Sequence, residues 1–149
     1  MDSPDTKPLI EELNATYRDG FVAAMGLEFL TATPTLVEMQ WTVAKHHLQP
    51  YGIVHGGVHS GVIETVCSVG AALAATERGQ LGGVVGLENH TSFLRAVREG
   101  TKLLARGTPI TRGRTTQVWQ AEIRDEAGQL IARGTVRLLS TPELGPKNT

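Results

Sequence analysis

The chain has 149 residues, 14 of them Lys or Arg and 15 Asp or Glu, so its formal net charge is −1, and it contains one cysteine. The length is typical of one domain with its own core. The balanced charge excludes binding to nucleic acid or to an anionic membrane through bulk charge, and the lone Cys67 excludes an internal disulfide framework.

Residues 1–149 are expected to form a single domain with short tails. The segments at about 1–8 and 141–149 are rich in Pro, charged and small polar residues, and we expect both to be frayed. The first residues lack the basic and apolar regions of a signal peptide, and no apolar run is long enough to span a membrane. The sequence therefore predicts a soluble, cytoplasmic protein.

The first elements expected along the chain are a helix and a hairpin. One apolar stripe at spacings of four predicts a single short amphipathic helix. Its members are Leu9, Leu13, Tyr17 and Phe21. Over residues 27–45 the period changes to two, which is typical of strands with one wet face, and the Thr33-Pro34 break divides this segment into two strands.

The next segment predicts a long helix from about Gly57 to Thr76. One side carries bulky apolar residues that can pack on a sheet: Val58, Val62, Val66, Val69 and Leu73. The other side carries only small residues within about 60° of Glu64: Gly57, Ser60, Gly61, Cys67, Ser68, Ala71 and Ala75. We expect this helix to be buried on both sides, with room for a helix, a second subunit or a ligand to approach Glu64.

Strand signals then persist to the end of the domain. Four extended runs, at residues 82–97, 100–113, 115–125 and 129–140, are separated by short turns of the kind that join antiparallel neighbours. Two strands, one long helix and four further strands predict an α+β fold, in which a helix packs on one face of an antiparallel sheet.

Glu64 is the candidate reactive group. No Lys or Arg lies three or four positions away, and residues 52–76 contain no other ionisable side chain except His55, His59 and Cys67. The plain alternative is a surface carboxylate on a thin polar seam with Ser60 and Ser68. Because an unpaired carboxylate is costly to bury, a lone one in such a helix is usually kept for chemistry or for a specific partner.

The start of the helix offers a second half of a site. Gly56 and Gly57 stand where a loop turns into the helix, so backbone N–H groups without intrahelical partners can point at a carbonyl oxygen or a phosphate. The alternative is that the two glycines merely make the turn. With Glu64 about 12 Å further along the axis, the segment has an end that holds an electrophile and an end that reacts.

These residues resemble a known family. The segments LQPYGIVHGGVHSGVIETVCS (48–68), VVGLENHTSFLRAVREG (84–100) and TRGRTTQVWQAEIRDEAGQLIARGTVRLL (111–139) are similar to hotdog-fold acyl-CoA thioesterases of the 4-hydroxybenzoyl-CoA and phenylacetate-pathway branch. The resemblance implies a long central helix wrapped by an antiparallel sheet. It also implies a homodimer with active sites at the subunit interface, commonly paired into a tetramer, and no cofactor apart from the coenzyme A of the substrate.

The resemblance also implies catalytic roles. Glu64 matches the catalytic carboxylate, acting as nucleophile or general base, and Gly56 the backbone N–H that polarises the thioester carbonyl. Gln49 matches the side chain that positions the thioester or the water, His55 the imidazole beside it, and Ser68 the hydroxyl one turn beyond the carboxylate. The implied reaction is hydrolysis of an acyl- or aryl-CoA to the free acid and coenzyme A.

Substrate contacts are expected from two further groups. On the helix and the following strand they are Gly57, Ser60, Asn89 and His90. For the coenzyme A phosphates, which Arg binds in bidentate fashion, they are Arg95, Arg98, Arg112 and Arg114, with Thr115 beside the last. Solvated turn residues are an equal alternative for Arg112 and Arg114.

Other functions are weaker matches. His55 and His59 are four residues apart, but His59 points away from Glu64 on the helical wheel and no further ligand cluster is present, so no metal site is expected. A hotdog enoyl-CoA hydratase or dehydratase would use a His and a carboxylate, yet the usual Asp-to-His arrangement is not visible. A noncatalytic acyl-CoA-binding protein stays open, although the chain has no spare residues for a DNA-binding effector domain.

Overall fold

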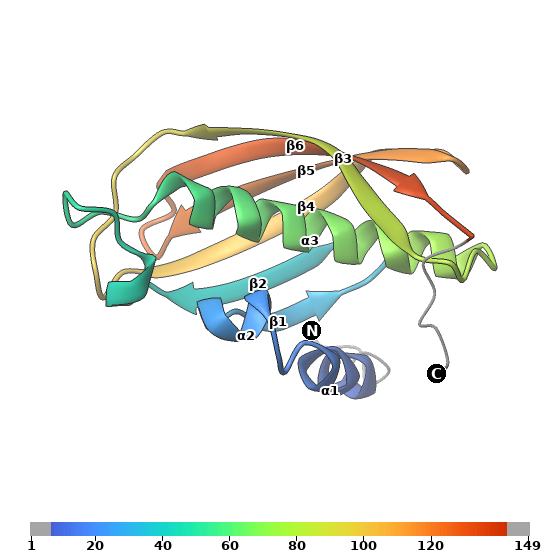
Figure 1. Ribbon diagram of the computed structural model, residues 1–149, viewed down its shortest axis with the longest axis horizontal. Coiled ribbons are helices and arrows are strands. Elements are labelled where there is room, and N and C mark those ends of the chain that lie inside the picture. Colours follow the sequence, from blue (N-terminus) through green and yellow to red (C-terminus); the bar gives the residue numbers. More distant parts are fainter. Residues whose placement is uncertain (1–6, 143–149) are drawn as a thin grey trace.

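A computed structural model describes residues 7–142 of the protein (Figure 1). In chain order its elements are α1 (Lys7–Thr16), α2 (Phe21–Met25), β1 (Glu28–Ala32), β2 (Val37–Thr42), the 3₁₀-helix η1 (Lys45–His47), α3 (Gly56–Glu77), β3 (Val84–Phe93), β4 (Lys102–Arg112), β5 (Thr116–Asp125) and β6 (Leu130–Ser140). The hairpin, the long helix and the four later strands that the sequence predicts are all confirmed.

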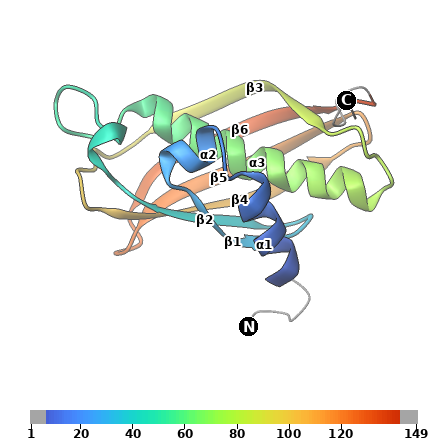
Figure 2. The same cartoon turned by 60° about the horizontal axis from the view of Figure 1, so that its bottom comes forward.

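The six strands form one antiparallel sheet around α3 (Figures 1 and 2). Their order is β1-β2-β4-β5-β6-β3, so β3, which directly follows α3 in the chain, pairs only with β6 and forms one edge of the sheet. At the other edge, α1 packs against β1. The predicted α+β architecture, with one helix on an antiparallel sheet, is confirmed.

Glycines let α3 approach the sheet closely. The stripe residues Val62 and Val66 are fully buried. A side chain at Gly70 would collide with the ring of Trp119, and a Cβ at Gly107 on β4 would lie 3.2 Å from a methyl carbon of Val66. The helix is long and apolar enough to cross a membrane by length and composition alone, but 61% of its most apolar window is buried inside the protein. It is the central core helix of the domain.

The N-terminal helix differs from the prediction. Instead of one helix through Leu9 and Phe21, the chain forms α1 and α2 with a break at residues 17–20. Gly20 has φ +91°, outside the helical region, so the backbone changes direction there. As a result Phe21 does not continue the stripe of α1; its ring lies over Gly61 of α3.

The predicted tails are only partly within the described range. Lys7 and Pro8 belong to α1, so the frayed segment predicted to reach residue 8 is wrong for these two positions. Residues 141 and 142 follow the end of β6. The remaining predicted tail residues, 1–6 and 143–149, lie outside the described residues.

The small side of α3 is open over only part of its length. Three of its members are fully buried within the chain: Cys67, Ala71 and Ala75. Partial exposure is kept by Ser60, Glu64 and Ser68. The opening around Glu64 is therefore confined to the first half and the middle of the helix.

Candidate active site

Glu64 lies in the middle of α3 and its carboxylate faces β3. The side-chain amide of Asn89 donates to Glu64 Oε2 at 3.0 Å and to the carbonyl oxygen of Ser60 at 3.1 Å. Thr91 Oγ1 in turn donates to Asn89 Oδ1 at 2.6 Å. These bonds fix the amide orientation and hold one carboxylate oxygen in place. Asn89, predicted as a substrate contact, is therefore already engaged with Glu64.

A glycine makes room for the carboxylate. Gly86 on β3 stands next to Glu64, and a Cβ at this position would collide with Oε1. The sequence alone gave no reason for a glycine at this position. The reason is steric, because only a residue without a side chain leaves space for the carboxylate.

Cys67 is the other ionisable group close to Glu64. Burial, and then the charge of Glu64, raise the pKa of the Cys67 thiol above its usual range. A thiol that stays protonated at neutral pH is a poor nucleophile, so Cys67 acts as a small packing residue.

The start of α3 presents one free backbone N–H. His55 is the N-cap, and its Nδ1 accepts a hydrogen bond from the Gly57 N–H at 2.8 Å. The Val58 N–H donates to the His55 carbonyl at 2.9 Å. The Gly56 N–H donates to none of the described residues. Of the two predicted glycine donors, Gly57 is thus used by the cap and Gly56 remains available.

A cleft of about 290 Å³ opens at this helix start. We call it the N-terminal cleft. It is lined by Gln49, Ile53, Val54, Gly56, His59, Phe93, Leu94, Arg95 and Ala96. It therefore brings together three predicted site residues, Gln49, Gly56 and Arg95. Phe93 packs on Gly56 so closely that a Cβ there would lie 2.8 Å from the ring. The side-chain oxygen of Gln49 accepts a hydrogen bond from the Tyr51 N–H.

His59 is the residue of this cleft that sequence reasoning missed. It is 3% exposed, and Nδ1 is buried without a hydrogen-bond partner. Burial lowers its pKa from 6.5 to about 4, so the imidazole is neutral at pH 7. The helical wheel correctly turns His59 away from Glu64, but the loop and strand that close over this side of the helix were not predictable from the wheel.

Several predicted residues are not brought to Glu64 within one chain. Arg112 lies 3.9 Å from Glu77 and donates to the Pro34 carbonyl at 3.3 Å. Glu77 is 13 residues beyond Glu64, or about 20 Å along the helix. Arg114 and Thr115 follow in the exposed turn after β4. This group lies at the far end of α3 from the N-terminal cleft.

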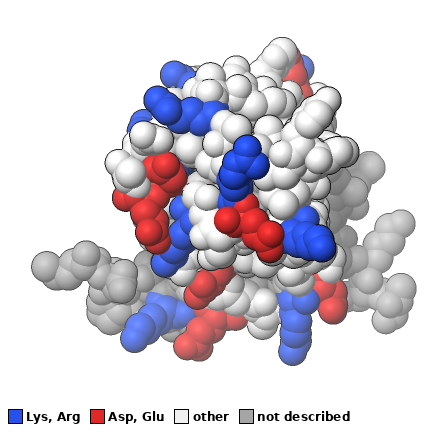
Figure 3. Space-filling model, turned by 90° about the vertical axis from the view of Figure 1, so that its left-hand side faces the viewer, with Lys and Arg blue, Asp and Glu red and all other residues white. Residues whose placement is uncertain are grey.

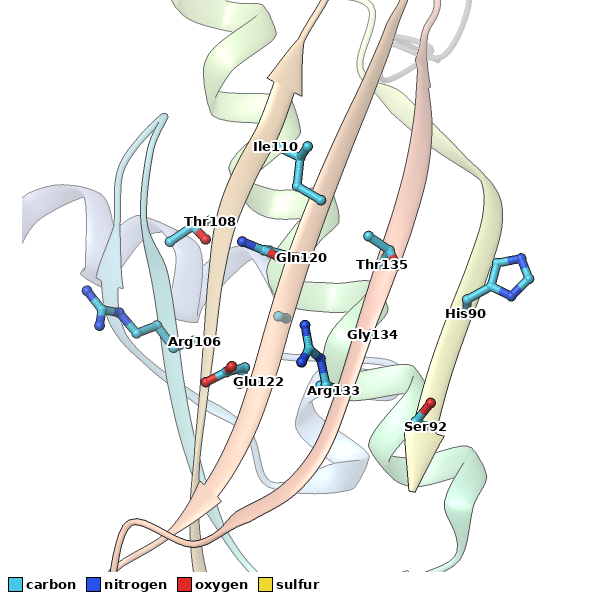
Figure 4. A pocket seen from close by; sticks show the side chains of 11 residues that line it. His90, Ser92, Arg106, Thr108, Ile110, Gln120, Glu122, Arg133, Gly134 and Thr135 are labelled. Carbon is cyan, nitrogen blue, oxygen red and sulfur yellow. The ribbon is translucent and has the colours of Figure 1, made fainter. Parts of the chain in front are cut away.

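His90 lies on the other face of the sheet. It is exposed and pairs with the Glu88 carboxylate, which also binds Arg137 at 3.2 Å. With Arg106, Gln120, Glu122 and Arg133 it lines a second cavity of about 770 Å³, shown in Figure 4 with α3 behind the strands. The sheet separates this outer cavity from Glu64, so it is not part of the same site.

The charges around the start of α3 are mixed. Figure 3, which views the end of the molecule that lies to the left in Figure 1, shows Lys and Arg side chains interspersed with Asp and Glu. No large basic surface covers the described residues seen from this side. No group of three or more His, Cys, Asp or Glu side chains among residues 7–142 is arranged to hold a metal ion.

Comparison with known proteins links this geometry to a family. The family model described as "Thioesterase superfamily" matches residues 51–132. The proofreading thioesterase EntH of Cronobacter turicensis is 36% identical over 138 residues, which cover 91% of this chain and 94% of the relative. The crystal structure of AziG from S. sahachiroi is 40% identical, with 82% of this chain and 96% of the other covered and a TM-score of 0.77. Thioesterase HI1161 of Haemophilus influenzae is 34% identical, with 94% of both chains covered and a TM-score of 0.81.

Proposed function

This chain belongs to the thioesterase superfamily and is a thioester hydrolase with the hotdog fold. We propose that its substrate is an acyl- or aryl-coenzyme A, which it cleaves to the free acid and coenzyme A. The observation that carries the proposal is the Glu64 carboxylate, held by Asn89 in the space left by Gly86. An oriented carboxylate in a largely uncharged helix is suited to attack a thioester or to activate water.

Two routes use the same parts. Glu64 attacks the carbonyl carbon, the C–S bond breaks to release the coenzyme A thiolate, and water then hydrolyses the resulting mixed anhydride. Alternatively, Glu64 takes a proton from water, the hydroxide attacks the carbonyl carbon, and the C–S bond breaks to release the coenzyme A thiolate and the free acid. In both routes the Gly56 N–H, at the positive end of the α3 dipole, stabilises the oxyanion. Ser68, one turn beyond Glu64 on the same face, is proposed to orient the water.

One subunit does not form a complete site. Gly56 and Glu64 are eight residues apart, about 12 Å along the helix, and the Gly56 N–H points away from Glu64. A nucleophile must come within about 3–3.5 Å of the carbonyl carbon, and an oxyanion donor within about 2.7–3.1 Å of its oxygen. A Glu side chain cannot bridge the difference. We therefore propose that the two groups acting on one thioester come from different subunits.

The edge strand β3 supports this homodimer. It pairs with β6 on one side only, and Leu87, Phe93 and Leu94 on and after it are about half exposed. An unpaired edge with apolar side chains is suited to antiparallel pairing with a second copy. Such pairing would also bring a second α3 towards the first. Two such dimers are proposed to associate into a tetramer.

Arg95, in the N-terminal cleft, is the proposed contact for coenzyme A from the subunit that supplies Gly56. Arg98 lies nearby, 3.4 Å from where a Cβ of Gly52 would be. His55 is proposed to shape the helix start through its cap, while Arg112 and Arg114 would reach a substrate only from another subunit. No cofactor besides the coenzyme A of the substrate is proposed, and the proposed location is the cytoplasm.

Paired variants test both the activity and the shared site. Glu64→Gln removes the nucleophile or base. Gly56→Pro removes the N–H at the first helical position, where Pro is tolerated, and the extended His55 (ψ 130°) suits a following Pro. Gly56→Ala is the matched control, since it places a similar carbon near Phe93 and keeps the N–H. Release of coenzyme A from benzoyl-CoA and hexanoyl-CoA is followed with a thiol reagent.

The Glu64→Gln and Gly56→Pro homodimers should each lose about 10²–10⁴-fold in kcat. The Gly56→Ala homodimer should lose much less. In a hybrid dimer of Glu64→Gln with Gly56→Pro, one of the two shared sites keeps both Glu64 and the Gly56 N–H. Such hybrids should therefore show about half the activity of a wild-type dimer. Hybrids that stay inactive would contradict the shared site. Unchanged turnover in Glu64→Gln would contradict its catalytic role, and hydration of an enoyl-CoA without thiol release would favour a hydratase.

A further inference from the structure

His59 is placed next to the free N–H of Gly56. The two residues are three positions apart on α3, about 60° around the helix, and both line the N-terminal cleft. Side chains in a helix tilt towards its N-terminus, so the His59 ring lies beside the first turn. A carbonyl oxygen that accepts a hydrogen bond from the Gly56 N–H would therefore lie close to the His59 ring.

The polar atoms of His59 have no protein partner. Neither ring nitrogen forms a hydrogen bond to the described residues, and Nδ1 is fully buried. An unsatisfied buried nitrogen costs about 1–3 kcal/mol, and such groups in native proteins call for an explanation. The ring forms part of the wall of the cleft, and Nε2 is not among the fully buried atoms, so a ligand in that cleft can reach Nε2.

Trp41 packs against the imidazole of His59. Its ring meets His59 edge-on with centroids 5.9 Å apart, and its Nε1–H is likewise buried without a partner. A neutral imidazole has one donor and one acceptor nitrogen. Nδ1 is the fully buried nitrogen and Nε2 is not, so the tautomer with the proton on Nε2 leaves a donor for a ligand in the cleft.

We propose that His59, as a neutral imidazole, donates a hydrogen bond from Nε2 to the thioester carbonyl oxygen and is a second oxyanion donor beside Gly56. The inference rests on the proposed thioesterase function. It adds a catalytic residue to that site on the subunit that supplies the helix start. As the carbonyl oxygen gains negative charge in the transition state, the Gly56 N–H and His59 Nε2–H both donate hydrogen bonds to it. The proton stays on Nε2 throughout.

Two near-isosteric substitutions test the proposal. His59→Met fills the space with a flexible apolar side chain, whereas His59→Gln has similar size and keeps an N–H donor. We expect His59→Met to lower kcat for the faster of benzoyl-CoA and hexanoyl-CoA about 10²-fold, with KM changed less than about threefold. His59→Gln should recover about tenfold of this loss. Equal kcat values in the two variants, or a rise in KM with kcat unchanged, would overturn the proposal.

A readout without substrate separates this inference from the proposed function. The ¹⁵N shifts of the His59 ring at pH 7 report which nitrogen carries the proton, whether or not the protein hydrolyses either thioester. The Nε2–H form is expected. The Nδ1–H form would overturn the proposal even in an active enzyme, whereas an Nε2–H form in a protein that releases no thiol would overturn the thioesterase proposal and, with it, the role of His59 in that reaction.

Discussion

Two tryptophans lie along α3, one at each half of the helix, and their indole N–H groups are treated differently. Trp119 packs on Gly70 in the C-terminal half, and its N–H donates to Gln117 Oε1 at 2.9 Å. The Gln117 amide donates in turn to the Ala71 carbonyl at 2.9 Å. Trp41 meets His59 in the N-terminal half, and neither its Nε1 nor His59 Nδ1 has a partner. Both tryptophans are at most 2% exposed.

The two tryptophans are equally buried but differ in hydrogen bonding, which indicates a structural role for one half of α3 and a functional role for the other. In the C-terminal half the Trp119 and Gln117 side chains find their partners within the protein, which stabilises the fold. In the N-terminal half a free Gly56 N–H and an unpartnered His59 are left at a cleft, where a ligand can satisfy them. Glu64 stands between the halves. Changes on either side should therefore separate turnover from stability.

The largest effect is expected where the two halves meet. Asn89→Leu removes the donor that holds Glu64 Oε2, while keeping a side chain of similar size. A displaced carboxylate should lower kcat about 10²-fold with little change in unfolding. Ser92→Ala, on the same strand but at the outer cavity, is the matched control and should turn over normally. Wild-type kcat in Asn89→Leu would show that Asn89 does not position Glu64.

In the C-terminal half the expected effect is on stability. Gln117→Leu leaves the Trp119 N–H and the Ala71 carbonyl without their side-chain partner in a buried site, at a cost of about 2 kcal/mol. Urea unfolding at one protein concentration measures the loss, and kcat per folded enzyme should be unchanged. His59→Met breaks no hydrogen bond and should not destabilise the protein at pH 7. If Gln117→Leu lowers kcat but leaves the free energy of unfolding unchanged, the C-terminal half does not have the purely structural role assigned to it.

The sequence predicts the architecture well because periodicity is a local property. The alternation at residues 36–43 and the bulky stripe of α3 each specify a buried face, and both are confirmed. The prediction of a single N-terminal helix was wrong because spacing alone does not reveal the backbone turn at Gly20. Three predicted site residues, Gln49, Gly56 and Arg95, line one cleft, and their roles stay predictions.

The less predictable features depend on contacts between distant segments. Gly86 became meaningful only when β3 was seen to cross Glu64, and His59 only when the loop at residues 53–54 and the segment at 93–96 closed over it. Likewise Arg112 was placed at the far end of α3 by the pairing of β4 with β2 and β5, which no local pattern specifies. Roles of individual residues in catalysis stay predictions.

The smallest expected effect is a pH dependence of stability that arises in the N-terminal half. Burial lowers the pKa of His59 from 6.5 to about 4, so between these values the unfolded chain binds a proton that the folded chain does not. This contribution to stability is fully present above pH 6.5 and is lost as the pH falls towards 4. Burial also lowers the pKa of His47, which adds to the loss in the same direction. Between pH 7 and pH 5 the wild type should lose about 1–2 kcal/mol more than His59→Met, measured by urea unfolding at one protein concentration. Equal losses would mean that His59 titrates normally in the folded protein, and the neutral imidazole at the cleft would then be restricted to pH values well above 6.5.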